Sequence, residues 1–214
     1  MKFLHVAWDF DGTLYNSYPH IVYCLSRALE TFGVTDSQER IAHYAHITLG
    51  HAFRFYAPLC GCSPEEVSAA YREQTKALGL SPHMAPYEGI GELLRDICLA
   101  GGKNHLCSNR RLEECRQYLQ RDGLEQYFDV LSCIGAREGL KSKPDPDLVS
   151  FILEEGKVSP DTMVMVGDRN LDHEAAHQVG VKGVFFDPDG FSEVSCDPEF
   201  IAPDISALRA ILLD

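Results

Sequence analysis

The chain has 214 residues, of which 45% are hydrophobic and 24% are charged, and this globular composition excludes disorder as its main state. Its 32 acidic and 19 basic side chains give a formal net charge of -13, so a nucleic-acid partner and an anionic membrane surface are both disfavoured. The length fits one large domain, or one domain with an inserted subdomain.

The first predicted element is a buried strand over residues 3–8, where apolar and β-prone residues run without a break into the turn sequence Asp9–Gly12. From about residue 16 to residue 84 the apolar side chains recur at spacings of three and four, and no strand is evident. That spacing is typical of amphipathic helices, so this whole stretch is predicted to be helical.

Beyond residue 86, short apolar runs alternate with helical patterns. Strands are predicted at residues 104–108, 128–133, 162–166 and 181–186. Helices are predicted at about 90–100, 113–121, 147–155, 171–179 and 205–213. The segment 187–203 is rich in proline, aspartate, glycine and serine, which predicts a loop.

The alternation of strands and helices predicts an α/β fold, with a Rossmann-like parallel sheet and helices on both of its faces. The all-helical stretch after the first strand does not fit this rhythm, so we interpret it as an inserted α-helical cap. The expected organisation is a core at residues 1–15 and 85–214 and a cap at residues 16–84.

Reactive side chains gather where the predicted strands end, and the carboxyl ends of parallel strands are where α/β proteins bind ligands. Asp9 and Asp11 follow the first strand, and two residues apart on extended backbone their side chains would point the same way. Converging carboxylates repel each other unless a cation lies between them, and hard oxygen ligands suit Mg²⁺. Gly12 would permit a tight turn here, although Asp-Gly is also an ordinary turn pair.

Three further groups stand at strand ends or helix starts. Ser108 and Asn109 end a strand, Lys143 precedes a proline, and Asp168 and Asp172 would share one face of the first turn of a helix. Each group also has a purely structural explanation. A serine at this place often caps a helix, a lone lysine before proline is usually exposed, and acids complement a helix dipole.

The four motifs, in this order, resemble those of the haloacid dehalogenase superfamily of phosphohydrolases, in its phosphoglycolate phosphatase-like branch. The resemblance rests on Asp9–Leu14, Leu106–Asn109, Lys143–Pro144 and Val166–Asp172, and it extends over essentially the whole chain. It implies hydrolysis of a small phosphorylated metabolite through an aspartyl-phosphate intermediate, with Mg²⁺ as the cofactor. Mg²⁺ and a lysine would let an acidic protein accept an anion, because they reverse the local field.

The resemblance also implies a role for each acid of the first motif. Asp9 would attack phosphorus, while Asp11 would protonate the leaving oxygen and then take a proton from the attacking water. Mg²⁺ would be bound by Asp9, by the backbone carbonyl of Asp11 and by Asp168.

The other motifs would hold the phosphoryl group. Ser108 and Lys143 would bind its oxygens, and Asp172 would hold a metal-bound water or Lys143 itself. Phosphate binding is further expected of Gly12, Thr13 and Asn109.

Specificity is expected to come from the cap. Gly50, His51 and Arg54 fall in a glycine-containing segment that faces the active site in related sequences, and His20 is a further candidate for substrate contact. The alternative is that these are exposed residues of cap helices. His173 and His177 stand four residues apart, a spacing that can bind metal on a helix, but we interpret them as two surface histidines.

The predicted function is a Mg²⁺-dependent phosphatase, and two alternatives remain. A phosphomutase of the same superfamily shares the aspartate pair, and a non-catalytic phospho-acceptor module of the signalling type also combines clustered acids with a lysine. Eight cysteines without a Cys-x-x-Cys pair predict reduced thiols. No apolar run reaches the roughly 20 residues of a membrane helix, and the first residues do not form a signal peptide. A cytoplasmic protein without a membrane partner is expected, and the oligomeric state is left open.

Overall fold

The computed structural model describes residues 3–82, 84–190, 192 and 194–214. The chain divides into two compact units: Met1–Tyr15 with Pro86–Asp214, here called the core unit, and Asn16–Ala85, here called the helical unit. The boundary of the helical unit differs by one residue from the expected cap range of 16–84. His83, which lies beside the expected boundary between cap and core, is outside the described residues.

The core unit is built on a six-stranded sheet in the order β5-β4-β1-β6-β7-β8, and every neighbouring pair of strands is parallel. Its strands are β1 (His5–Trp8), β4 (Lys103–Arg111), β5 (Phe128–Ile134), β6 (Met163–Gly167), β7 (Lys182–Phe186) and β8 (Phe200–Ala202). The α/β fold class predicted from the sequence is therefore confirmed.

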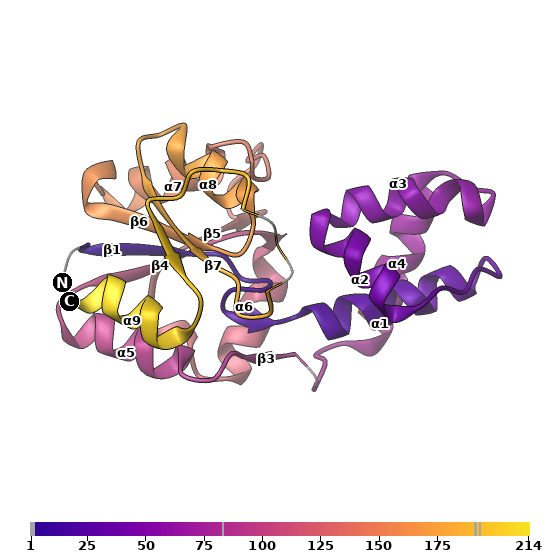
Figure 1. Ribbon diagram of the computed structural model, residues 1–214, viewed down its shortest axis with the longest axis horizontal. Helices are drawn as coiled ribbons and strands as arrows, with labels where there is room; N and C mark the ends of the chain where they lie inside the picture. Colours follow the sequence, from indigo (N-terminus) through magenta and orange to yellow (C-terminus); the bar gives the residue numbers. More distant parts are fainter. Residues whose placement is uncertain (1–2, 83, 191, 193) are drawn as a thin grey trace. The chain divides into compact units, whose positions relative to one another are not determined.

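Helices cover both faces of this sheet. They are α5 (Ile90–Leu99), α6 (Leu112–Arg121), α7 (Asp147–Gly156), α8 (Asn170–His177) and α9 (Ile205–Leu213), with short 3-10 turns at Glu125–Tyr127 and Pro160–Thr162. Figure 1 shows α7 and α8 on one face and α5 and α9 on the other. Beneath α7 and α8, small and apolar side chains of the central strands form one buried cluster that includes Ala7, Cys107 and Met165.

The register of the central strands brings the predicted motifs to one edge. Trp8 of β1 is paired with Leu106 of β4 and with Val166 of β6. The residues that follow each of these three strand positions therefore emerge side by side at the carboxyl end of the sheet. The amide of Asp9 continues the ladder by donating to the carbonyl of Val166 over 2.9 Å.

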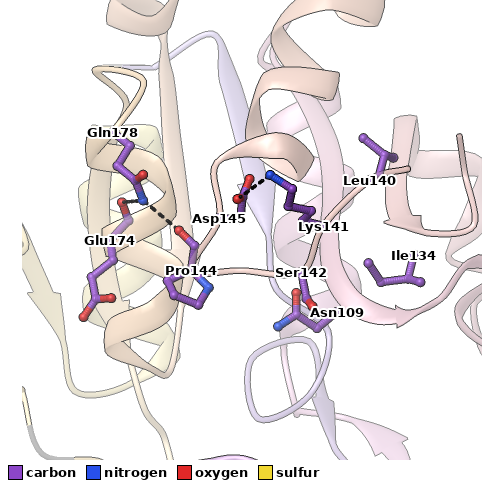
Figure 2. Close-up of a pocket in the computed structure, with 9 residues that line it drawn as sticks. All are labelled: Asn109, Ile134, Leu140, Lys141, Ser142, Pro144, Asp145, Glu174 and Gln178. Atoms are coloured by element: carbon purple, nitrogen blue, oxygen red, sulfur yellow. Dashed lines mark hydrogen bonds and ion pairs between the residues drawn. The ribbon is translucent and has the colours of Figure 1, made fainter. Parts of the chain in front are cut away.

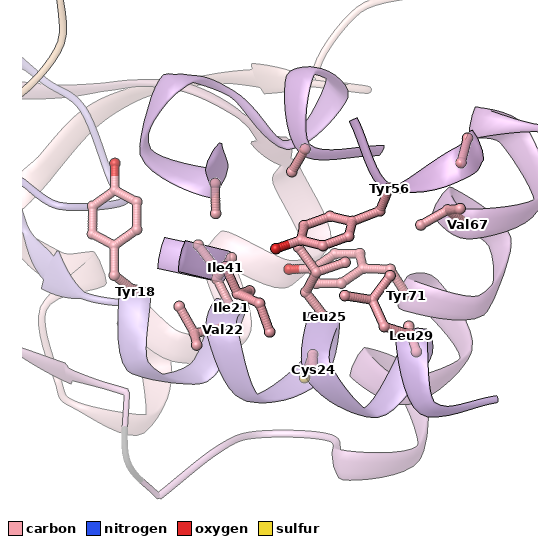
Figure 3. Packing of buried hydrophobic residues seen from close by; sticks show 14 residues of the cluster. Tyr18, Ile21, Val22, Cys24, Leu25, Leu29, Ile41, Tyr56, Val67 and Tyr71 are labelled. Atoms are coloured by element: carbon pink, nitrogen blue, oxygen red, sulfur yellow. The ribbon is translucent and has the colours of Figure 1, made fainter. Parts of the chain in front are cut away.

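The helical unit consists of α1 (Tyr18–Glu30), α2 (Gln38–Ile47), α3 (Leu49–Cys60) and α4 (Pro64–Leu78). Its helices bury a cluster of aromatic and aliphatic side chains, in which Leu25 and Leu29 of α1 lie near Tyr56 and Tyr71 (Figure 3). Helix α4 begins with a capping box, because Ser63 accepts from the amide of Glu66 and Glu66 accepts from the amide of Ser63. The two chain segments that connect the units pair as short strands, β2 (Tyr15–Asn16) and β3 (Ala85–Pro86).

The sequence predicts neither of the short strands β2 and β3, and two further elements also differ from the prediction. β4 continues to Arg111 instead of ending at Ser108, and the segment 187–203 is not loop throughout, because β8 lies within it. Strand β8 has only three residues, so its sequence shows almost no alternation of apolar and polar residues. It is held at the edge of the sheet partly by an edge-to-face contact between Phe200 and Phe3. Among the described residues, no helix combines the length and apolar character needed to span a membrane. All eight cysteines are free thiols.

Candidate active site

Asp9 and Asp11 leave the end of β1 on a tight turn. Gly12 has a φ of 79°, in the left-handed region, and its amide donates to the carbonyl of Tyr15 over 2.9 Å. The two carboxylates do not share one partner as extended backbone would suggest. Asp9 is buried and pairs with Lys143, whereas Asp11 pairs with Arg110.

A group of three buried carboxylates lies at this edge of the sheet. Asp9, Asp168 and Asp172 each offer an oxygen within 4.8 Å of the others. Asp168 follows β6, and Asp172 projects from the first turn of α8. Their approach depends on Gly167, because a Cβ at that position would stand 2.5 Å from the Cβ of Asp172. A residue with any side chain at position 167 would push α8 away.

Lys143 is the ammonium at the centre of this group. Its Nζ lies 2.8 Å from Asp9 Oδ1 and 2.5 Å from Asp172 Oδ1, and it donates to the carbonyl of Cys107 over 2.6 Å. Lys143 is only 3% exposed, so the ordinary expectation of a surface lysine before proline does not hold. Burial acts to lower the pKa of Lys143, but the carboxylates of Asp172 and Asp9 raise it above its ordinary value. The two carboxylates therefore favour the charged form of this side chain.

Asn109 holds the backbone of Lys143 in place. Its Oδ1 accepts from the amide of Lys143 over 2.7 Å, and its Nδ2 donates to the carbonyl of Lys143 over 3.0 Å. The side chain thus clamps a loop 34 residues away, next to the cis peptide bond between Lys143 and Pro144. This contact gives Asn109 a positioning role that the sequence did not suggest, alongside the expected role in phosphate binding.

The remaining predicted residues of the core unit lie at the same edge. Ser108 is buried, and its hydroxyl accepts from the amide of Arg110 over 3.2 Å. Thr13 is also buried, and its hydroxyl donates to Asp168 over 3.5 Å. The structure therefore gathers residues from all four motifs, which lie up to 163 positions apart (9 to 172) in the sequence.

The site also contains two arginines that the sequence analysis did not predict. Arg110 binds Asp11 through two nitrogens, with Nη2 2.7 Å from Oδ1 and Nε 3.2 Å from Oδ2. Arg169 lies 3.6 Å from Asp9 and 3.7 Å from Asp168. Arg110 directly follows the second motif and Arg169 lies within the fourth, so proximity to a strand end was the available signal.

The donor set fits a divalent cation. Three buried carboxylates face one ammonium and the more distant guanidinium of Arg169, which leaves an excess of negative charge in a buried place. Asp9 Oδ2 is buried without a hydrogen-bond partner. Burial raises the pKa of Asp9, although Lys143 opposes this shift. A hard cation bound by carboxylate oxygens would relieve the excess charge and would give Asp9 Oδ2 a close partner, and these oxygens are ligands that Mg²⁺ prefers.

The predicted specificity residues lie in the helical unit. Gly50, His51 and Arg54 occupy the first two turns of α3, where Thr48 caps the helix by accepting from the amide of His51 over 2.9 Å. Arg54 is exposed, whereas His20 in α1 is buried and its ring lies 3.8 Å from the sulfur of Cys24.

The prediction for the pair of histidines on α8 is wrong for one of them. His173 is fully buried against β7, where it stacks on Phe185 at 5.5 Å, and only His177 is at the surface, where it pairs with Glu199. Gly183 makes room for the buried ring, since a Cβ there would lie 2.2 Å from His173 Nδ1. The helical spacing alone could not show that a glycine on the neighbouring strand β7 makes room for this ring.

A hollow of about 880 Å³ opens beside the loop that carries Lys143. Figure 2 shows Gln178, the residue that follows α8, reaching across to this loop, where its Nε2 donates to the carbonyl of Pro144 over 2.7 Å. The carboxylates of Asp9, Asp168 and Asp172 do not line the hollow. Its lining residues are Asn109, Ile134, Leu140, Lys141, Ser142, Pro144, Asp145, Glu174 and Gln178.

Comparison with known proteins decides the family. Residues 6–186 match the model of the haloacid dehalogenase-like hydrolases. The chain belongs to the haloacid dehalogenase-like hydrolase family. This membership confirms the resemblance inferred from the four motifs, and it covers both the core unit and the inserted helical unit.

Two curated proteins and one solved structure show what this chain is similar to. The tyrosine-protein kinase PtkA of Mycobacterium tuberculosis is 31% identical over 180 residues, which are 84% of this chain, and the match spans only 60% of that protein's length. The phosphoglycolate phosphatase of Vibrio vulnificus is 28% identical over 223 residues, which cover 97% of this chain and 95% of the relative. The crystal structure of a predicted phosphoglycolate phosphatase from Haemophilus somnus superimposes with a TM-score of 0.83 over 99% of this chain and 98% of that one, at 18% identity.

Proposed function

We propose that the protein is a Mg²⁺-dependent phosphatase that hydrolyses a small phosphorylated metabolite. The observation that supports this most directly is the buried ion pair between Asp9 and Lys143, set among the carboxylates of Asp168 and Asp172. A carboxylate next to a fixed cation and a cation-binding group is what phosphoryl transfer requires, because its catalysis consists mainly of positioning and charge neutralisation.

The proposed reaction has two steps. In the first, an oxygen of Asp9 attacks phosphorus and the bond to the leaving oxygen breaks, while Asp11 gives a proton to that oxygen. In the second, water attacks phosphorus and gives a proton to Asp11, and the bond between phosphorus and Asp9 breaks. The alcohol and inorganic phosphate are the products, and both aspartates return to their starting forms.

The other residues of the site stabilise the phosphoryl group in both steps. Lys143 and the hydroxyl of Ser108 would bind its oxygens, and the backbone around Gly12, with Thr13 and Asn109, would complete the cradle. Asp172 would keep Lys143 oriented, in line with their 2.5 Å contact. Asp9, the backbone carbonyl of Asp11 and Asp168 would hold Mg²⁺, which when bound neutralises charge on the phosphoryl oxygens.

The substrate class is proposed from the phosphoglycolate phosphatase of Vibrio vulnificus, whose match spans almost the whole length of both proteins. A small phosphomonoester of the phosphoglycolate type fits that relationship. The helical unit is proposed to serve as the cap that selects the substrate, through His20, Gly50, His51 and Arg54. The free thiols support a reducing compartment such as the cytoplasm.

The decisive experiment compares the wild-type protein with the Asp9→Asn variant on 4-nitrophenyl phosphate in the presence of Mg²⁺. The variant keeps the size of the side chain but removes the nucleophile, so turnover should fall by more than about 1,000-fold while the circular dichroism spectrum stays the same. A panel of phosphorylated metabolites, assayed by phosphate release, would then identify the substrate. Undiminished activity of Asp9→Asn, or of the wild type in excess chelator, would refute the proposal.

A second candidate is transfer of the phosphoryl group to an acceptor other than water. It is motivated by the 31% identity to a protein named as a tyrosine-protein kinase. A phosphomutase would also use another acceptor, the second hydroxyl of a sugar phosphate. Both alternatives predict that the phosphoryl group is recovered on the acceptor and that little free phosphate appears, whereas a phosphatase releases one phosphate for each alcohol.

A further inference from the structure

Arg110 contacts Asp11, the proposed acid–base residue, and the proposed reaction gives Arg110 no role. It follows Ser108 and Asn109 at the end of β4, and its side chain is 9% exposed. Its guanidinium faces Asp11 with the two-nitrogen geometry described above, at 2.7 and 3.2 Å. A fork of this kind fixes both the position and the rotation of a carboxylate, which a single contact does not.

The guanidinium is itself held in place from two further sides. Its third nitrogen, Nη1, lies 3.4 Å from Glu114 in the first turn of α6. The ring of Phe10 lies beneath it at 5.6 Å from the guanidinium carbon, and that ring stacks on Tyr15 at 4.4 Å. Every nitrogen of the guanidinium therefore faces a carboxylate oxygen, and the group is anchored to a helix and to an aromatic stack of the core unit.

The geometry points to Arg110 as the positioning residue of Asp11. It holds the carboxylate at one place relative to the turn after β1, so that the proton acceptor is already oriented when water attacks the phosphorylated Asp9. The inference rests on the proposed function, since it assigns a task within that reaction. Arg110 acts through Asp11 and makes none of the bonds to the phosphoryl group.

This role makes a prediction that separates the two steps of the reaction. With 4-nitrophenyl phosphate, the leaving nitrophenolate departs as an anion and needs no proton from Asp11. The second step still needs Asp11 as a base, because the attacking water must lose a proton. Misplacing Asp11 should therefore leave the first step intact and slow the second.

The test is pre-steady-state kinetics of Arg110→Gln with 4-nitrophenyl phosphate and Mg²⁺. We expect a burst of about one nitrophenolate per active site, followed by a steady state about 10–100-fold slower than in the wild type, with kcat/KM within about threefold. Arg110→Lys keeps the charge but loses the fork, so its steady state should also slow by more than about threefold.

Two further variants serve as a graded test and as a control. Glu114→Gln loosens the anchor of Arg110 without touching Asp11, and a smaller slowing of the second step is expected. Arg116→Gln removes another ion pair of α6, the 2.9 Å contact with Glu125, and should leave both phases unchanged.

The inference fails if kcat and kcat/KM of Arg110→Gln fall together without a burst, if they do not fall, or if Arg110→Lys reaches the wild-type rate. These outcomes are distinct from failure of the proposed function, which would appear as nitrophenolate release by Asp9→Asn. Melting curves of each variant show whether the fold is retained, and Arg110→Lys gives a second measurement should Arg110→Gln unfold.

Discussion

The two ends of the central sheet bury different kinds of polar side chain. At the carboxyl end, Asp9 and Lys143 are buried as a charged pair with Asp168 and Asp172 beside them. At the amino end, the buried polar side chains include Asn104 and the imidazole of His105, whose Nε2 lies 3.0 Å from His5 Nδ1. Charges that are buried together destabilise a fold unless they are paired or bind a ligand. The carboxyl end therefore buries an excess of charge that a bound cation would stabilise, whereas the amino end buries polar side chains that carry no formal excess charge.

The largest effect is expected from Lys143→Met, which removes the ammonium that pairs with both Asp9 and Asp172. Asp9 and Asp172 would then face each other without their cation, and breaking such a buried pair costs about 3–5 kcal/mol. Turnover should be lost, and chemical denaturation at neutral pH should show the lower free energy of unfolding. Adding Asp172→Asn should restore part of that stability but none of the activity. A fully stable Lys143→Met would contradict the contrast between the two ends.

A pair of glycine substitutions compares the two ends with the same added methyl group. Gly167→Ala would press on Asp172, and Gly183→Ala would press on His173, the next residue of α8. Each should cost about 1–3 kcal/mol of stability, as overpacking usually does. Only Gly167→Ala should also lower kcat, by about 100-fold, because only Asp172 contacts Lys143. If Gly183→Ala lost as much activity as Gly167→Ala at a temperature where both are folded, the assignment of different roles to the two ends of the sheet would be wrong.

At the amino end, the unfolding free energy should depend on pH through His105. Burial, together with His5, lowers its pKa to about 4 from the ordinary 6.5, while Asp129 opposes and Lys103 adds to this shift. Between these values the unfolded chain binds more protons than the folded chain, so stability is present above pH 6.5 and is lost as the pH falls towards 4.

For this one site the linkage amounts to about 2 kcal/mol between pH 7 and pH 5. Urea titrations at the two pH values measure it, and His105→Gln should reduce the difference between them by about that amount. Equal pH dependence in the wild type and the variant would show that the imidazole is not the group responsible.

The smallest effect is expected from Asp129→Asn, also at the amino end. This residue forms a 2.9 Å ion pair with Lys103, but both side chains are about half exposed, at 41% and 52%. Exposed pairs of this kind contribute about 1 kcal/mol or less. Denaturation curves of the variant and the wild type should nearly coincide, and activity should not change. A loss of unfolding free energy as large as that of Lys143→Met would mean that the exposure of an ion pair does not determine how much it stabilises the fold.

The sequence was sufficient for the fold class and for the gathering of the motifs, because both follow from periodicity and from the parallel order of strands. Four site residues lie at one edge of the sheet because each follows a strand or a loop that the hydrophobic pattern predicts: Asp9, Ser108, Lys143 and Asp168. The burial of Lys143 could not be predicted, because it depends on two carboxylates that are 134 and 29 residues away (143 minus 9, and 172 minus 143).

The details that the sequence did not predict are contacts between side chains and distant backbone. Asn109 was expected to touch phosphate, but its hydrogen bonds to Lys143 arise only when β4 and the loop before α7 lie together. Arg110 carries no motif of its own, and its pairing with Asp11 depends on the turn at Gly12. Local patterns indicate which residues reach the edge of a sheet, whereas the partner of each residue is set by the tertiary arrangement.

The position of the helical unit in the chain also has a consequence for how the protein folds during synthesis. Strand β1 is translated early, yet its neighbours in the sheet are far along the chain, since His5 pairs with Lys103 and with Met163. The segment Asn16–Ala85 is continuous, so it can collapse on the ribosome before either neighbour exists. Contacts over such separations form slowly because a long loop must close first. The strand that carries Asp9 is thus made early and is completed by its neighbours late.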